Sequence, residues 1–183
     1  MPIKFVATCL TAEQEQACIS LGIHVVQDYA RSHGEITPGC VTDFSVHCFN
    51  SAALEVLRSL GVQRATLHPE LNLAQIRDIK KCMDTEAVIY GKIPLMQIGS
   101  PTLEGVVTDR TGARFFAHGD KLYNCVPVFM ADKLKEIEKS EITHGRFVFT
   151  TENEEEVRAV IRAYMYRKTM TIEFTRGKFY SKV

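Results

Sequence analysis

The sequence has no excess of charge, because its 183 residues contain 22 lysines and arginines and 22 aspartates and glutamates. A neutral chain is not expected to coat nucleic acid with a basic surface, although a local basic groove is compatible with it. The chain also has no run of about 20 apolar residues, so we expect no membrane-spanning helix. Residues 1–7 resemble an apolar strand leading into a capped helix and not a secretory signal, which predicts a cytoplasmic protein.

Common chemical motifs are missing as well. The six cysteines, at positions 9, 18, 40, 48, 82 and 125, include no Cys-x-x-Cys pair. Without a secretory signal they are expected to be reduced thiols, and those on apolar segments (Cys9, Cys18 and Cys48) are interpreted as buried small side chains. Neither Gly-x-Ser-x-Gly nor His-Glu-x-x-His occurs, so spacing assigns no catalytic nucleophile and no metal-activated water.

What the sequence does contain is an alternation of short apolar strands and amphipathic helices. Short connections between successive strands and helices predict parallel pairing with right-handed crossovers. We find no linker, so we expect one domain over residues 1–183. The expected strands cover residues 4–9, 23–26, 44–49, 64–67, 87–90 and 147–149, the expected helices 12–21, 52–60, 128–139, 154–166 and a stretch from 73 onward, and residues 28–38 form a loop.

Four helix starts carry capping signals. Thr11 with Gln14, and Asn72 with Gln75, have the capping-box form, in which two side chains satisfy free backbone amides. A third box is expected at residues 151–154, and Asn50 is expected to cap the helix that follows it.

The stretch from residue 86 to residue 127 is the least generic part of the chain. An apolar strand ends in Gly91 and soon meets Pro94, which is typical of a strand-exit loop. Two strand-like pieces then flank Asp109-Arg-Thr-Gly112, which predicts a β-hairpin over residues 105–116. Loops at strand ends carry function in α/β folds, so a site is expected here.

Six segments, in order along most of the chain, form a pattern: Phe49-Asn-Ser51, Leu67-His-Pro-Glu-Leu71, Tyr90-Gly-Lys-Ile-Pro-Leu-Met96, Thr108-Asp-Arg-Thr-Gly112, Leu122-Tyr-Asn124 and Phe174-Thr-Arg-Gly-Lys-Phe-Tyr180. This pattern resembles the collagenase-like peptidases, family thirty-two of the peptidases of unknown catalytic type. The chain is similar to the C-terminal part of that family's catalytic module.

The resemblance implies a partial or reduced TIM-barrel-like α/β fold with a β-hairpin insertion. The chain is short of the roughly 250 residues of a complete eight-unit barrel. Either the barrel is incomplete and a second copy or a partner subunit covers its open edges, with residues 171–183 near the contact, or it closes in a smaller form.

The resemblance also implies chemistry. Some members are oxygen-independent hydroxylases of RNA bases or quinone precursors and hold an iron–sulfur cluster with four cysteines, and others carry a protease, hence hydrolase, label. Residues 97–106 and 119–121 stand where family cysteines are common, and they contain none. A cluster needs about four converging thiolates, so we expect no cluster and no other cofactor.

Site candidates come from strand ends and from the matched motifs. His47, His68 and Glu70 could form a two-imidazole, one-carboxylate set, or could be strand-end residues that only make hydrogen bonds; we expect no metal. Asp109 and Arg110 could present a guanidinium to a carboxylate or phosphate, or Asp109 could hydrogen-bond its own turn. The remaining candidates for substrate binding are Asn50, Tyr90, Tyr123 and Asn124.

Two interpretations of function stay open. The chain is either a degenerate or partner-dependent family member that provides a binding surface, or an active family enzyme, a protease or a hydroxylase. RNA and peptides are both conceivable ligands, because the segment after residue 157 interleaves basic and aromatic side chains. Such a segment can equally be a solvated end or a subunit contact.

Overall fold

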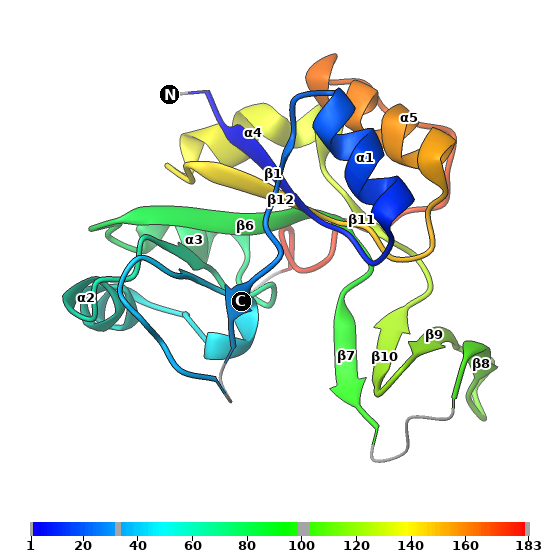
Figure 1. Cartoon of the computed structure of the whole chain (residues 1–183), viewed down its shortest axis with the longest axis horizontal. Coiled ribbons are helices and arrows are strands. Elements are labelled where there is room, and N and C mark those ends of the chain that lie inside the picture. Colours follow the sequence, from blue (N-terminus) through cyan, green and yellow to red (C-terminus); the bar gives the residue numbers. More distant parts are fainter. Residues whose placement is uncertain (1, 32–33, 99–102, 182–183) are drawn as a thin grey trace.

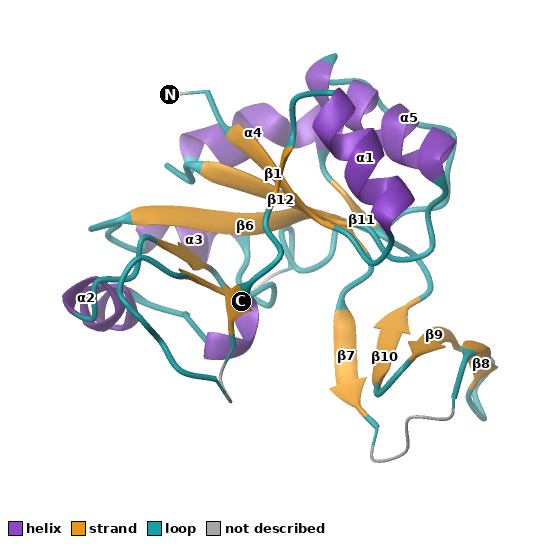
Figure 2. Ribbon diagram, viewed as in Figure 1, coloured by secondary structure: helices purple, strands orange, loops and turns teal. Residues whose placement is uncertain are grey.

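The computed structural model describes residues 2–31, 34–98 and 103–181, and it has a curled parallel sheet with helices outside and a separate antiparallel sheet (Figures 1 and 2). Seven parallel strands form the main sheet in the order β2-β1-β12-β6-β5-β4-β3. Their bounds are β1 Lys4–Thr8, β2 His24–Val25, β3 Tyr29–Ala30, β4 Val41–Thr42, β5 Arg64–Thr66, β6 Asp84–Gly91 and β12 His144–Val148. The helices are α1 Ala12–Ser20, α2 Ser51–Ser59, α3 Leu73–Asp78, α4 Leu134–Lys139 and α5 Glu154–Met165, with short 3₁₀ helices η1 Phe44–Val46 and η2 Ala131–Lys133.

The two ends of this sheet are neighbours in the chain. Strands β2 and β3 stand at opposite ends of the strand order, and only residues 26–28 separate them. The segment 24–30 therefore pairs with β1 by its first half and with β4 by its second half. The predicted partial or reduced TIM-barrel-like sheet is confirmed, and its outer strands belong to one continuous segment.

The main core lies between the outer face of the sheet and the helices. Tyr164 of α5 is its centre, with its ring edge-on to Phe147 at 4.8 Å and to Phe129 at 5.3 Å between centroids. Its hydroxyl donates to the carbonyl of Ile89 and accepts from the backbone N–H of Met130 at 2.7 Å. Helix α5 is thereby fixed against β6 and lies beside α1 (Figure 2).

The predicted hairpin is confirmed and belongs to a larger insertion. Strands β7 (Pro94–Gln97), β8 (Gly105–Thr108), β9 (Arg114–His118) and β10 (Lys121–Asn124) pair antiparallel in the order β7-β10-β9-β8. This hairpin sheet projects from the barrel, and the chain returns through β11 (Val128–Phe129), which pairs antiparallel with the end of β6 (Figure 1).

Residues 174–181 are not a solvated end. They pack on the barrel: Thr175 bridges Val128, and the carbonyl of Phe179 accepts from the N–H of Leu73 at 3.0 Å. Arg176 forms a two-pronged ion pair with Asp132 at 2.6 and 2.9 Å. We call residues 174–181 the C-terminal strap.

The predicted strand 44–49 is wrong. Parallel pairing occurs earlier, at β4, and within the predicted range Cys48 makes an isolated parallel bridge with Leu67. Phe44–Val46 instead forms η1, after which His47 takes a left-handed backbone with φ of 58°. The alternating apolar pattern arises because Phe44 lines a cavity while Val46 packs against the core. Period-two patterns in a compact loop resemble those of a strand.

Other boundaries move by a few residues. The predicted loop 28–38 includes β3, the predicted helix 128–139 is split into β11, η2 and α4, and the strand predicted at 147–149 is β12, which begins at His144. The third capping box, expected at residues 151–154, instead uses Asn153 and Glu156, and Glu152 turns inward to Tyr90. The caps at Thr11, Asn50 and Asn72 are confirmed. No helix in the described ranges is long and apolar enough to cross a membrane.

Candidate functional site

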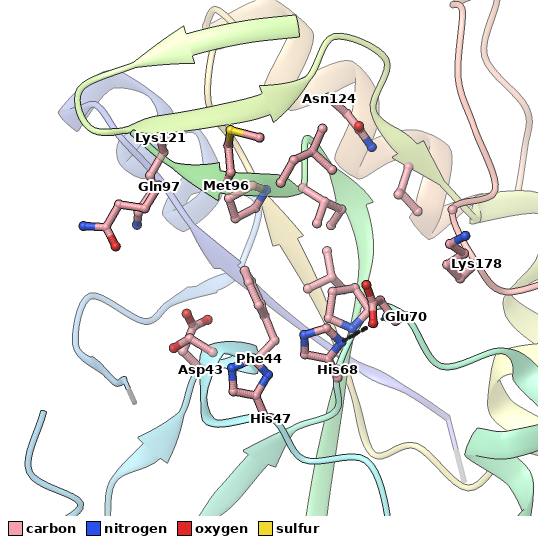
Figure 3. Close-up of a pocket in the computed structure, with 18 of the residues that line it drawn as sticks. Asp43, Phe44, His47, His68, Glu70, Met96, Gln97, Lys121, Asn124 and Lys178 are labelled. Carbon is pink, nitrogen blue, oxygen red and sulfur yellow. Dashed lines mark hydrogen bonds and ion pairs between the residues drawn. The ribbon is translucent and has the colours of Figure 1, made fainter. Parts of the chain in front are cut away.

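A cavity of about 1010 Å³ lies at the carboxyl ends of β4, β5 and β6, beneath the hairpin sheet and beside the C-terminal strap. Parallel α/β sheets place ligand sites at this edge. Figure 3 shows Asp43, Phe44, His47 and His68 on the barrel side, with Met96, Gln97 and Lys121 across the cavity on the hairpin sheet. Lys178 of the strap adds a cation to the lining.

The barrel side of the cavity carries an aromatic wall made of His47, Phe49 and His68. The His68 ring lies 4.3 Å from the Phe49 ring and 5.2 Å from the His47 ring, centroid to centroid, and the two imidazoles are stacked at 25°. The left-handed backbone of His47, described above, allows its side chain to reach His68. The wall therefore gathers three rings at one place on the cavity lining.

The surroundings of His68 favour its neutral form. Burial and the neighbouring His47 lower its pKa, and Glu70 opposes them only partly. Its Nδ1 accepts the backbone N–H of Glu70 at 3.3 Å. The neutral ring therefore carries its proton on Nε2. His68 thus provides a hydrogen-bond donor, while the Glu70 carboxylate, 3.9 Å from Nδ1, stays 70 % exposed.

The barrel interior below the cavity is charged, and sequence reasoning missed it. Glu86, with no exposed surface, accepts from Arg64 at 2.8 Å and from Tyr29 at 3.0 Å. Arg146 donates to Asp43 at 2.6 Å and stacks on the Tyr29 ring at 3.8 Å. These contacts join β3, β5, β6, β12 and the residue after β4, which is possible only across the inside of a curled sheet.

We call Arg64, Glu86, Arg146 and Asp43 the interior charge network. Opposite charges alternate along it, and Asp43 at its end lines the cavity. The available signal was a charged residue between apolar strand positions, as in Thr85-Glu86-Ala87 and Gly145-Arg146-Phe147. In a barrel such positions face inward.

The predicted site residues divide into two groups. His47, His68, Glu70 and Asn124 line the cavity. The others serve the fold: Asn50 caps α2, and Tyr90 donates to the buried Glu152 at 3.0 Å. Tyr123, 7 % exposed, packs against Phe116.

Asp109 and Arg110 lie in the hairpin turn, outside the cavity lining. The Asp109 carboxylate accepts from Thr111 N and Oγ1 at 2.7 Å and from Ala113 N at 2.9 Å. These hydrogen bonds, first that from the Thr111 hydroxyl, lower the pKa of Asp109. Asp109 therefore bonds to its own turn, whereas Arg110 is exposed, and its presentation to a carboxylate or phosphate stays a prediction.

The described cysteines do not lie together as the ligands of an iron–sulfur cluster would. Among the residues that the structure describes, which include all six cysteines, no three His, Cys, Asp or Glu side chains are grouped as a metal site requires. Only Cys9 and Cys18 have a described sulfur–sulfur contact, at 3.7 Å, and neither lines the cavity. The four thiolates that a cluster needs are therefore not at one point.

A family comparison agrees with the motifs. The model of Peptidase family U32 matches residues 25–160, which is 136 of the 183 residues. This chain belongs to Peptidase family U32, the collagenase-like family. No curated protein and no solved structure matches it.

Proposed function

We propose that this family member binds a planar, ring-bearing molecule in its cavity and acts as a degenerate or partner-dependent member, without a cluster of its own. The observation that carries the proposal is the aromatic wall of His47, Phe49 and His68 facing an apolar stretch of the hairpin sheet across about 1010 Å³. Cavities of this size and character enclose ligands of small-molecule size.

The lining suggests how such a ring would be held. One face would stack on Phe49 or His68, and the other would meet Ile93, Pro94 and Met96. The Nε2–H of His68 would donate to a ring carbonyl or ring nitrogen, and the Asp43 carboxylate would accept a ring N–H or hydroxyl. Nucleobases and quinone precursors, the substrates implied by the family resemblance, both carry these groups.

Cations lie at separate places on the lining. Arg31 follows β3, Lys121 lies on the hairpin sheet, and Lys178 lies on the C-terminal strap. A carboxylate or phosphate attached to the ring would find a counter-charge near any of them. Three carboxylates, those of Asp43, Glu70 and Asp120, line the same cavity, so an acidic group would bind only beside one of the three cations.

The residues present do not support redox catalysis through a chain-borne cluster, because their thiols are dispersed. Any such chemistry would have to come from a partner subunit, which would make this chain the binding half of a complex. The absence of a cofactor remains a prediction.

Ligand fluorescence tests the proposal with little background, because the chain has no tryptophan. We would titrate the protein with 4-hydroxybenzoate, adenosine monophosphate and a proline-rich peptide. Binding would be followed by the fluorescence of the ligand, or by the fluorescence of a probe that the ligand displaces. Replacing Phe49 by Ala should weaken binding of ring compounds about 5- to 150-fold, since stacking contributes about 1–3 kcal/mol.

His24→Ala is the matched control, because His24 is exposed and does not line the cavity. It should leave affinity unchanged. Absence of saturable binding for every compound would contradict the proposal, as would equal effects of the two substitutions. Turnover of the peptide or of a ring compound by the isolated chain would favour the alternative, an active family enzyme.

A further inference from the structure

Cys9 and Cys18 form a pair of thiols away from the cavity described above. Cys9 follows the end of β1, and Cys18 lies on the buried side of α1. Their sulfur atoms are 3.7 Å apart and hydrogen-bonded, with either able to donate. No sulfur–sulfur contact of this kind is described for the other four cysteines, all of which lie in the described ranges.

The connection between the two residues is held in place. Thr11 and Gln14 close a capping box at the start of α1. The Gln14 amide also donates to the carbonyls of Thr150 at 3.1 Å and Glu152 at 2.7 Å, which ties the turn to the exit of β12. The β1–α1 turn that joins the two cysteines is therefore fixed by hydrogen bonds to the rest of the barrel.

Only one of the two thiols is reachable. Cys9 lines a small cavity of about 260 Å³, together with Thr11, Val26 and Gln27. Cys18 has no exposed surface. An incoming reagent would meet Cys9 first, with Cys18 directly behind it.

The small cavity carries one carboxylate in its lining. Glu15 is part of its lining. The hydrogen bond to Cys18, burial, and the carboxylates of Glu15 and Glu152 together raise the pKa of Cys9. The same hydrogen bond lowers the pKa of Cys18. A cationic reagent would be attracted to this site and an anionic one repelled.

We propose that Cys9 and Cys18 are a reversible thiol–disulfide site whose oxidant is a small cationic disulfide. In the first step the Cys9 sulfur, on losing its proton, attacks one sulfur of the reagent RSSR, giving a mixed disulfide and one RSH. In the second step Cys18 attacks the Cys9 sulfur, the mixed disulfide breaks, and a second RSH leaves. The two thiol protons end on the two RSH molecules, and the reagent takes up the two electrons.

The geometry is suited to the second step. The two sulfurs start 3.7 Å apart, in van der Waals contact, and a disulfide bond of about 2.0 Å requires them to approach by about 1.7 Å. The enclosed segment is short, so the change is confined to the β1–α1 turn. Cys18 is shielded from the reagent and can act only as the resolving thiol.

The experiment uses the reduced full chain under anaerobic conditions with three disulfides at equal concentration: cystamine, 2-hydroxyethyl disulfide and oxidised glutathione. Intact mass and peptide mapping should show loss of two hydrogens and a Cys9–Cys18 cross-link. Cystamine should react at least about tenfold faster than oxidised glutathione. A folded protein that forms no Cys9–Cys18 cross-link with any of the three would overturn the proposal.

Variants separate the roles of the two thiols. Cys18→Ser should stop at a mixed disulfide on Cys9 with one thiol released, and Cys9→Ser should leave Cys18 unmodified. Glu15→Gln retains both thiols and should reduce the preference for cystamine. A mixed disulfide that persists on Cys9 in the wild-type chain, or a preference that Gln at position 15 does not change, would contradict the proposal.

Discussion

Replacing Gly91 by Ala should be among the most destabilising single changes in this protein. Gly91 ends β6 with a φ of +123°, a conformation that side chains of L-residues rarely adopt. A Cβ there would lie 2.1 Å from the carbonyl oxygen of Val148 and 2.9 Å from its carbonyl carbon. Since Gly91 pairs with Val148 in the parallel ladder, this neighbour is backbone and cannot rotate away.

The expected magnitude has two parts. The unfavourable φ costs about 1–3 kcal/mol. Forcing an atom into packed surroundings costs about 1–3 kcal/mol more. Together they give about 2–6 kcal/mol, which is a large part of the roughly 5–15 kcal/mol by which folded domains are stable.

Gly22→Ala is the control, because Gly22 has a φ of +75° and no atom within 4 Å of an added Cβ. It should show only the backbone part of the cost. Urea unfolding followed by circular dichroism measures both variants against the wild type. If the two variants lose the same free energy, the close approach of β6 and β12 is not what requires glycine at position 91.

Further predictions address the interior, the strap and the cofactor. Glu86→Gln should lower the free energy of unfolding by about 3–5 kcal/mol, because it leaves buried guanidinium groups without their carboxylate, whereas Arg158→Gln on the surface should change it by less than about 1 kcal/mol. Burial lowers the pKa of His144 to about 4, below its unfolded value of about 6.5. The unfolded chain then binds more protons, so stability should fall as pH drops from about 6.5 to about 4, and His144→Gln should weaken that slope; identical slopes would refute this. A chain ending at Tyr166 should melt at a lower temperature and lose ring binding, because it lacks the strap; unchanged melting would show that the strap is dispensable. Reconstitution with iron and sulfide should leave the protein colourless, and about four irons per chain would overturn that expectation.

Much of the fold could be predicted because its signals are local. Capping residues such as Thr11 and Asn72 act within one turn, and a turn sequence such as 109–112 fixes its own hairpin. Parallel order followed from the short connections. The error at residues 44–49 arose because η1 is set by a distant partner, Arg146, which holds Asp43 inside the barrel.

The arrangement of the two ends of the sheet could not be predicted by counting strands. We expected open edges because we took each strand to pair along its whole length with one neighbour on either side. Instead the segment 24–30 divides its pairing between β1 and β4. An uncovered barrel edge therefore no longer requires a second copy, and a homodimer or a partner subunit stays a prediction that light scattering on the full chain can decide.

The candidate site was harder to predict than the fold, because its residues come from distant parts of the chain. His47 and His68 were expected to meet at strand ends, and their rings do stack. Asp43, Lys121 and Lys178 carry no local signal, since any surface turn or strand contains such residues. Only the three-dimensional arrangement of η1, β10 and the strap brings them to one cavity.

The family motifs that this chain retains contain residues that the fold itself requires. Gly91 is required by the backbone of Val148, Asp109 by its own turn, and Asn50 by the first turn of α2. Tyr90 is required by Glu152 in the core. Each of these positions would be under selection in a family member with no catalysis at all, because the barrel and the hairpin sheet depend on them. Their retention is therefore evidence for a preserved scaffold, whereas His47, Phe49 and His68 line the cavity and are the residues that favour a bound ring.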